Sequence, residues 1–453
     1  MPSLWSDVRS VLKLAVPVAL AELGWMAMTT VDTIMIGRLG PASIGAIGIG
    51  SSAFYSLAIF GMGLLLGLDT LVSQAFGAGN REDCHRSLTQ GVYLAAGLTV
   101  PLMTLFVFSP PIFRWLGIVE PVAGLAGVFT RTLSFSTLPL LLYAAFRRYL
   151  QALGHVRPVM FVLISANLIN WGGNWLLIEG HWGFPALGVA GSALSTCLAR
   201  VYMAGVLAFF VWWFERRLEP GFANLVRRPD WVRLRVLVRL GFPAATQILL
   251  EVGAFGAAAM LAGRLAPVAL AAHQIAINCA SLSFMVPLGI SSAAAVAVGQ
   301  AIGRGAIATA RRNGYISLSL GCLFMAASAL SFLSFPLLIL KVYTKDPTVL
   351  RLGVGLLAIA ALFQLFDGVQ TVATGALRGL GNTRGPMIVN LAGYWLVGLP
   401  IGYALCFRYG LGIYGLWWGL TVALIGISVS LLFVWQKYSS TIDINRAINI
   451  VNS

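Results

Sequence analysis

Three carboxylates lie within stretches of the sequence that are otherwise apolar. Asp32 follows "LKLAVPVALAELGWMAMTTV", Glu251 lies in "GFPAATQILLEVGAF", and Asp367 lies in "LFQLFDGVQTV". A carboxylate at the centre of a membrane helix costs about 2.5–3.5 kcal/mol on insertion scales, so such residues usually serve a function. A carboxyl group can bind a proton or a monovalent cation and release it again when its surroundings change. These three acids are therefore the first candidates for chemistry.

Amide side chains with helical spacing are the expected partners of Asp32. Asn167, Asn170 and Asn174 in "NLINWGGN" recur at i, i+3 and i+7, which is one face of a helix. Amides within a bilayer need polar partners, so this face is expected to point inward. With Thr196 of "GSALSTC", they would surround Asp32 with neutral oxygens, a composition that suits a hard monovalent cation or a proton. The alternative is that the amides only hydrogen-bond neighbouring helices.

A second group of candidates surrounds Glu251 and Asp367. Gln247 lies one turn before Glu251, and Phe363 lies one turn before Asp367. Glu251 is about 17 Å from the end of its helix at 1.5 Å per residue, which is near mid-membrane. No basic residue is placed nearby in either span. We expect these four residues to form a cation and substrate site, with structural ion pairing as the alternative.

Other polar residues in the spans are weaker candidates. Glu22 follows Pro17, which can kink its helix, and Asp69 lies near a helix end where it can bond backbone or loop groups. Their roles stay open at this stage. His273 is expected to be a polar anchor. The five cysteines show neither a CxxC motif nor metal-ligand spacing, so we expect them to pack in the spans and no structural metal to be bound.

The composition indicates a membrane protein. Hydrophobic residues make up 58% of the chain and charged residues 10%, and the mean hydropathy is +0.86. A soluble domain carries about 25% charged residues. Twelve apolar runs are long enough to cross a bilayer, and they lack the short alternating pattern of barrel strands. The sequence predicts an all-α polytopic membrane protein with twelve transmembrane helices.

The net charge of +15 is explained by topology. Most lysines and arginines fall in the even-numbered loops and the two tails, which the positive-inside rule assigns to the cytoplasm. Both termini are therefore expected to be cytoplasmic, and the bilayer rather than nucleic acid is the expected partner. Arg200 is the basic residue that falls inside a predicted span.

The chain repeats itself at an offset of 226 residues. Pro17 aligns with Pro243, Gly63 with Gly289, and Gln74-Ala75 with Gln300-Ala301. Each half holds six spans, an even number, so the halves form two six-helix bundles related by a parallel pseudo-two-fold repeat. Two such bundles are typical of transporters that work by alternating access. The predicted parts are an N-lobe over 1–213, a cytoplasmic linker over 214–235, a C-lobe over 236–436 and a cytoplasmic tail over 437–453.

Five segments in order resemble one transporter family. They are "VDTIMIGRLG", "LDTLVSQAFGAG", "ILLEVGAF", "AAHQIAIN" and "DGVQTVATGALRGLGNTR". Over nearly the whole chain the sequence resembles the multidrug and toxic compound extrusion (MATE) family, and the acids at Glu251 and Asp367 resemble its NorM-like branch. Members are cation-coupled antiporters that export organic cations while Na⁺ or H⁺ enters.

The resemblance implies roles for particular residues. It implies an N-lobe cation and proton site at Asp32, Asn170 and Asn174, and a C-lobe cation site at Glu251 and Asp367. Some NorM-like members carry a tyrosine one turn before the acid of helix ten, where this chain has Phe363. That departure leaves the choice between H⁺ and Na⁺ open.

The expected function is export of small organic cations across the bacterial inner membrane, by a monomer with no cofactor and no enzymatic activity. Moving a monovalent cation out against the membrane potential costs about 2.3 kcal/mol per 100 mV, which an entering H⁺ or Na⁺ can supply. Two alternatives stay open. A lipid-linked oligosaccharide flippase of the same broad superfamily would need a basic cavity. A non-transport membrane protein could be an intramembrane enzyme, which would need a motif such as HExxH that is absent, or a receptor or scaffold, which would not need a seam lined by unpaired acids.

Overall fold

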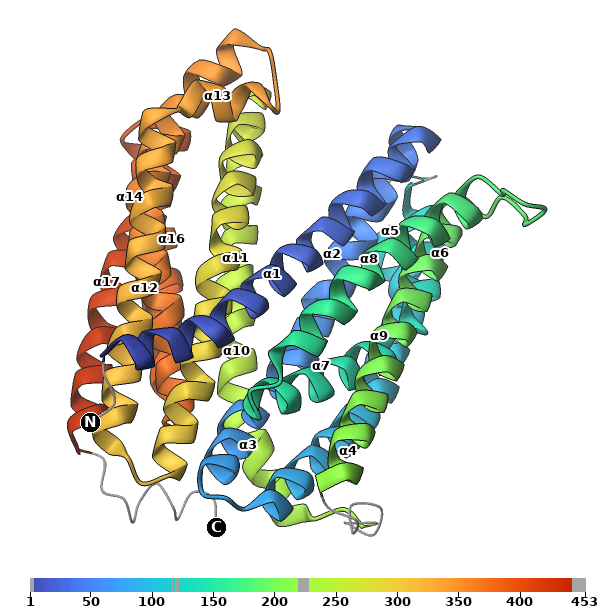
Figure 1. The fold of residues 1–453 in the computed structure, drawn as a ribbon. Helices are drawn as coiled ribbons and strands as arrows, with labels where there is room; N and C mark the ends of the chain where they lie inside the picture. The colour runs from blue at the N-terminus through green and yellow to red at the C-terminus, as the bar shows by residue number, and fades with distance from the viewer. Residues whose placement is uncertain (1–3, 116, 119, 121, 219–227, 442–453) are drawn as a thin grey trace. The chain divides into compact units, whose positions relative to one another are not determined.

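The computed structural model describes residues 4–115, 117–118, 120, 122–218 and 228–441, and the regular structure in these ranges is helical (Figure 1). Residues 219–227 of the predicted linker and 442–453 of the predicted tail lie outside this part. The α-helices are α1 (Leu4–Ile36), α2 (Pro41–Leu64), α3 (Gly67–Gly77), α4 (Arg81–Val107), α5 (Ser109–Trp115), α6 (Val122–Ser134), α7 (Thr137–Ala152), α8 (Val156–Ile178), α9 (Val189–Leu218), α10 (Trp231–Ala262), α11 (Pro267–Gly303), α12 (Ile307–Ser334), α13 (Pro336–Lys341), α14 (Pro347–Gly379), α15 (Arg384–Asn390), α16 (Leu399–Tyr403) and α17 (Ile413–Thr441).

The spans match the twelve that the sequence predicts. Among the described residues, eleven helices are long and apolar enough to cross a membrane. The twelfth span is the pair α6 and α7, which bend by 50° relative to each other. The helices from α15 onward to Arg408 form one span that contains two π-helical stretches, Leu391–Gly398 and Ala404–Arg408. The predicted all-α polytopic fold is confirmed.

The repeat is visible in the backbone. Gly79, after α3, has φ 76°, and its counterpart Gly305, after α11, has φ 71°. Gly154 and its counterpart Gly381 have φ 84° and 82°. These left-handed conformations end a helix at little cost only where the residue has no Cβ. The same turns therefore recur at the same places in both halves.

The chain forms two compact units, which we call unit 1 and unit 2. Unit 1 comprises Met1–Ala19, Gly77–Gly79 and Thr246–Ser453, and unit 2 comprises Leu20–Phe76 and Asn80–Ala245. Both boundaries that cut a helix lie two residues after an internal proline, Pro17 in α1 and Pro243 in α10. The 226-residue repeat matches these boundaries. Each half therefore gives the first part of its first helix to the unit built mainly by the other half.

The cores of the two units agree with this exchange. Ala15 of α1 belongs to the apolar core of unit 1, where α11, α12, α14 and α17 pack together (Figure 1). Leu237 and Leu240 of α10 belong to the core of unit 2, with residues of α4, α7, α8 and α9. Burial of these side chains removes them from water and fixes each helix segment in its unit.

Glycines allow the exchanged segments to approach closely. A Cβ on Gly63 of α2 would lie 2.6 Å from the Cα of Ala245 in unit 2. A Cβ on Gly289 of α11 would lie 2.6 Å from the Cα of Ala19 in unit 1. The two contacts are equivalent in the repeat. Small residues of this kind are what membrane helices use to bring backbones together.

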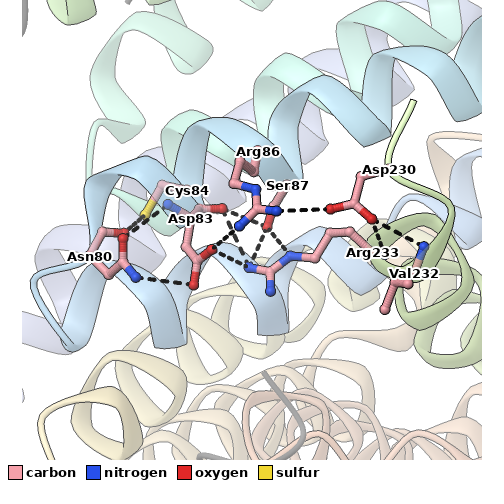
Figure 2. A network of polar contacts seen from close by, with 8 residues as sticks. All are labelled: Asn80, Asp83, Cys84, Arg86, Ser87, Asp230, Val232 and Arg233. Atoms are coloured by element: carbon pink, nitrogen blue, oxygen red, sulfur yellow. Dashed lines mark hydrogen bonds and ion pairs between the residues drawn. The ribbon is translucent and has the colours of Figure 1, made fainter. Parts of the chain in front are cut away.

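Polar contacts hold the start of α10 against α4 in unit 2 (Figure 2). The Arg233 guanidinium donates to the Ser87 hydroxyl at 3.0 and 3.1 Å and lies 3.6 Å from Asp83. Asp230 accepts from Arg86 at 3.1 Å and also caps α10 by accepting from the backbone N–H of Arg233. Charge-assisted bonds of this kind are among the stronger polar contacts in proteins.

Unit 1 has a comparable ion pair, in which the exchanged segment supplies the acid. Asp7 of α1 forms an ion pair with Arg312 of α12. The repeat aligns Asp7 with Arg233 and Arg312 with Arg86. Each exchanged segment is therefore held to the third span of its unit by an ion pair, in addition to its apolar contacts.

We expect Gly63→Ala and Gly289→Ala to destabilise the protein by about 1–3 kcal/mol, because the added methyl groups meet backbone atoms that cannot move alone. Gly48→Ala is the matched control, since a Cβ there has no heavy atom within 4 Å. Thermal unfolding in detergent, followed by size-exclusion chromatography, measures the shift. Equal melting temperatures for all three variants would contradict the close approach.

Candidate functional site

Asp32 lies near the end of α1 in unit 2, and three of its four predicted partners, Asn170, Asn174 and Thr196, surround it. Its carboxylate accepts from Asn174 Nδ2 at 2.5 Å and from Thr196 Oγ1 at 3.3 Å. Asn170 Nδ2 donates to Thr196 Oγ1 at 3.4 Å, and Asn170 Oδ1 accepts from Asn174 Nδ2 at 3.4 Å. Both asparagines are fully buried. Side chains from three helices therefore form one small polar cage.

Close packing of α8 against α9 positions this cage. Ser195 Oγ donates to the backbone carbonyl of Asn170 at 2.7 Å. A Cβ on Gly173 would lie 2.5 Å from that same Ser195 oxygen, so glycine is needed for the approach. Asn167 does not join the cage, although the spacing placed it on the same face. Its Nδ2 donates instead to the backbone carbonyl of Gly24 at 3.0 Å and ties α8 to α1.

Arg200 lies one turn after Thr196 on α9 and is 1% exposed. Its guanidinium donates to Ser136 Oγ at 2.6 Å and to Tyr55 Oη at 3.0 Å. It also lies 4.8 Å from the centre of the Phe54 ring, a cation–π arrangement. These partners are neutral, so Arg200 interacts with Asp32 only through space. Asp32 forms no ion pair within the described ranges.

The second predicted group lies in unit 1. Asp367 of α14 is 5% exposed and interacts electrostatically with Glu251 of α10. Glu251 is half-buried and interacts with the Gln370 side chain. Across the part of the chain that the structure describes, neither acid pairs with a lysine or arginine. Two carboxylates so placed repel each other unless a proton or a cation neutralises one of them.

Aromatic side chains lie one helical turn from each acid, Phe255 after Glu251 and Phe363 before Asp367. Phe363 is 1% exposed, and its ring centre lies 6.0 Å from that of Phe255 and 5.6 Å from that of Trp417. Gln247 is buried on α10. Such packing excludes water, which strengthens every electrostatic interaction inside the site.

Two residues of this site were not predicted as members. Tyr394 Oη donates to Gln370 Oε1 at 3.0 Å, and both residues are fully buried. Tyr394 lies in the first π-helical stretch, a conformation that often occurs at functional positions. Gln370 follows Asp367 by one helical turn, so this spacing could have identified it as a member of the site. No signal in the sequence indicated that Tyr394 would lie near Glu251 and Asp367.

The start of α14 is fixed by a capping residue. Asp346 accepts from the backbone N–H of Thr348 at 2.7 Å and from that of Val349 at 3.3 Å. Hydrogen bonds from the Thr348 hydroxyl and these two amides lower the pKa of Asp346 below its ordinary value. The cap is therefore charged at neutral pH, where it also complements the positive end of the helix dipole.

Glu22 and Asp69, the other two acids considered as candidates, have arginine partners on α7. Glu22 forms an ion pair with Arg147, and both side chains are about nine-tenths buried. Asp69 lies 3.5 Å from Arg148. The expectation that Arg200 is the basic residue inside a span was thus incomplete, because Arg147 is 7% exposed. These pairs give Glu22 and Asp69 a structural role.

Other predicted features behave as packing groups. His273 is buried and accepts a hydrogen bond at Nδ1 from Trp417 Nε1 at 3.1 Å. The five cysteines are free, and Cys322 is the exposed one. Among the described residues, no group of three or more His, Cys, Asp and Glu side chains is arranged to hold a metal ion.

A family model, MatE, matches two segments of the chain, residues 17–176 and 243–404. Together they cover well over half of the sequence. The chain belongs to the MatE family. The two matches begin 226 residues apart, at Pro17 and Pro243, which is the repeat found in the sequence. The predicted resemblance to the MATE family is confirmed.

Curated relatives and solved structures agree with this membership. A probable multidrug resistance protein NorM of Mesorhizobium japonicum is 36% identical, covering 96% of this chain and 95% of its own. The multidrug resistance protein NorM of Burkholderia vietnamiensis is 37% identical, covering 97% and 96%. The crystal structure of the eukaryotic MATE transporter AtDTX14 has a TM-score of 0.87 at 20% identity, covering 99% of both chains. An outward-facing MATE transporter structure has the same TM-score at 18% identity and 96% coverage of both.

We expect Arg147→Met to destabilise this MatE protein by about 3–5 kcal/mol, because it leaves the Glu22 carboxylate buried without a partner. The double variant Glu22→Gln/Arg147→Met should recover much of that loss, since neither charge remains. Thermal unfolding in detergent measures both effects.

The control is the exposed pair Arg114–Glu120, whose side chains are 65% and 54% exposed. Arg114→Met should change stability by only about 0–1 kcal/mol. If Arg147→Met were no worse than Arg114→Met, the structural role of the Glu22 pair would be wrong.

Proposed function

We propose that this protein is a cation-coupled antiporter that exports organic cations, drugs among them, from the cytoplasm. Its membership of the MatE family and its relatives named as multidrug resistance proteins support drug export. The observation that carries the coupling is the Glu251–Asp367 pair, because it lies in membrane spans and has no basic partner. Such a pair needs a cation or proton, which a cationic drug can replace.

Competition for the acids is the proposed coupling step. A carboxylate that holds H⁺ or Na⁺ has less charge to offer a drug, so binding of one weakens binding of the other. We assign the Asp32, Asn170, Asn174 and Thr196 cage to cation and proton binding. We assign Glu251, Asp367, Gln247 and Phe363 to cation and substrate binding, with Gln370 orienting Glu251.

Transport by this scheme requires two faces that open in turn. We propose that an N-lobe over 1–213 and a C-lobe over 236–436 rock against each other, with 214–235 as a cytoplasmic linker and 437–453 as a cytoplasmic tail. The two-fold repeat supports this division, and the basic loops support cytoplasmic termini. The expected site of action is the bacterial inner membrane, and the expected active form is a monomer.

The flippase alternative finds little support. A lipid-linked pyrophosphate would need accessible basic groups in the transport path. Arg200 is 1% exposed and already bonded to Ser136 and Tyr55, and Arg147 is paired with Glu22. These arginines are therefore not free to bind a pyrophosphate group.

We expect Asp32→Asn, Glu251→Gln and Asp367→Asn each to reduce ethidium or norfloxacin export to the level of cells without the protein, because each removes an exchangeable charge. Export is measured by dye efflux in an efflux-deficient host, with membrane levels checked by immunoblot. Glu120→Gln is the control, since Glu120 is exposed and outside both groups. Full export by the Glu251 and Asp367 variants would reject the proposed site.

We expect drug release from proteoliposomes to accelerate under an imposed pH gradient or an inward Na⁺ gradient, because a cation must enter as the drug leaves. The two gradients are applied separately, so the faster one identifies the coupling ion. Asp367→Asn should remove the acceleration while leaving passive leak unchanged. Equal release with and without both gradients would contradict antiport.

A further inference from the structure

A groove of about 1030 Å³ lies in unit 1, away from both acid groups. It is bordered by Val8 of α1, the first turns of α12 and the last turn of α17. Its polar lining consists of Arg311, Arg312, Ser319, Ser439 and Ser440, and its apolar lining along α12 consists mainly of Ile316, Leu320 and Leu323. The lining is thus basic at the start of α12 and apolar further along.

The repeat identifies the matching place in unit 2, where a buried carboxylate has side-chain partners. There Glu215 of α9 is 1% exposed, lies 2.5 Å from His85 Nε2, and accepts from Tyr149 Oη at 2.7 Å. The offset of 226 aligns His85 with Arg311. The offset of 224 that fits the last span of each half aligns Glu215 with Ser439. Unit 1 therefore has an arginine at the position of His85 and a serine at the position of the Glu215 carboxylate.

Arg311 is the cation of the groove that is left without an acid. Arg312 is neutralised by Asp7. Arg311 is exposed and lies 5.9 Å from the centre of the Tyr315 ring, and no carboxylate pairs with it within the described ranges. An exposed guanidinium in a groove that also contains serine hydroxyls can donate hydrogen bonds to a phosphate group.

The other end of the groove is lined by a helix that is apolar enough to cross a membrane. α12 is a candidate span with a hydropathy of 2.0, and Leu323, Leu330 and Leu333 on it are 70%, 65% and 56% exposed. Leu323 lies about 18 Å further along the helix than Arg311, at 1.5 Å per residue. A ligand that uses the whole groove must therefore combine an anionic group with a long apolar chain.

We propose that this groove binds an anionic phospholipid, with its phosphodiester at Arg311 and an acyl chain along Leu320 and Leu323. Basic pockets between membrane helices are known to take such head groups. The arginines disfavour a cationic drug at this place. A free phosphate would use only the polar end and leave the apolar end unfilled. The ligand of unit 1 would thus supply the negative charge that Glu215 supplies in unit 2.

Lipid titration tests the proposal without reference to transport. The full-length protein is stripped of lipid in detergent and titrated with phosphatidylglycerol, and the melting temperature gives the affinity. Arg311→Gln is expected to weaken binding about fivefold, the effect of one arginine near an anionic lipid. Arg304→Gln is the matched control, because Arg304 is exposed nearby but does not line the groove.

Three results of the titration would overturn the proposal. They are an unchanged affinity in Arg311→Gln, an equal response to phosphatidylcholine, and an equal response to glycerol phosphate, which would mean that only the polar end binds. A selective response to phosphatidylglycerol that is lost in Arg311→Gln and kept in Arg304→Gln would support it.

Photo-crosslinking in native membranes identifies the occupant directly. A benzophenone amino acid replaces Ser319, which is exposed and lines the groove. Mass spectrometry is expected to find the mass of an anionic phospholipid added to this site. An adduct with a peptide from residues 442–453, or with a second copy of the chain, would show a different occupant and overturn the proposal.

Discussion

The structure depends on how each charge inside the membrane is compensated. A charge removed from water is tolerated only where a partner of opposite sign, a set of hydrogen bonds or an exchangeable ion replaces its hydration. Glu22 and Asp69 have arginine partners on α7, so their charges are permanently balanced. Asp32 has neutral donors, and Glu251 and Asp367 have each other. The compensation therefore separates the acids that hold the fold together from those that are suited to transport.

The two halves of the repeat share residues that shape the backbone but differ at the acids Asp32 and Glu251. Positions that shape the backbone are the same in both halves, such as Pro17 and Pro243, which lie beside the unit boundaries. Positions that carry charge differ. Asp32 aligns with Ala258, which is buried in the core, and Glu251 aligns with Trp25, which stacks on Tyr143 at 6.1 Å. One helical frame thus supports two different polar sites.

Each of the two polar sites contains an acid from a helix that has parts in both units. α1 carries Asp32 in unit 2, while its first part packs in unit 1. α10 carries Glu251 in unit 1, while its first part packs in unit 2. Each of these two helices therefore contributes residues to both units, and glycine contacts and ion pairs fix the exchanged part.

The sequence by itself determined the membrane class, the twelve spans, the repeat and the acids within the spans. These features depend on local composition and on spacing along one helix, and both can be read directly from the sequence. Only the tertiary structure decided which acids have basic partners, that Asn167 bonds α1 while Asn170 and Asn174 approach Asp32, and that Tyr394 and Gln370 join the second site. Those outcomes depend on how each helix is rotated about its axis and how far it is shifted against its neighbours. Packing between helices distant in the sequence sets both quantities, so spacing within one helix cannot define them.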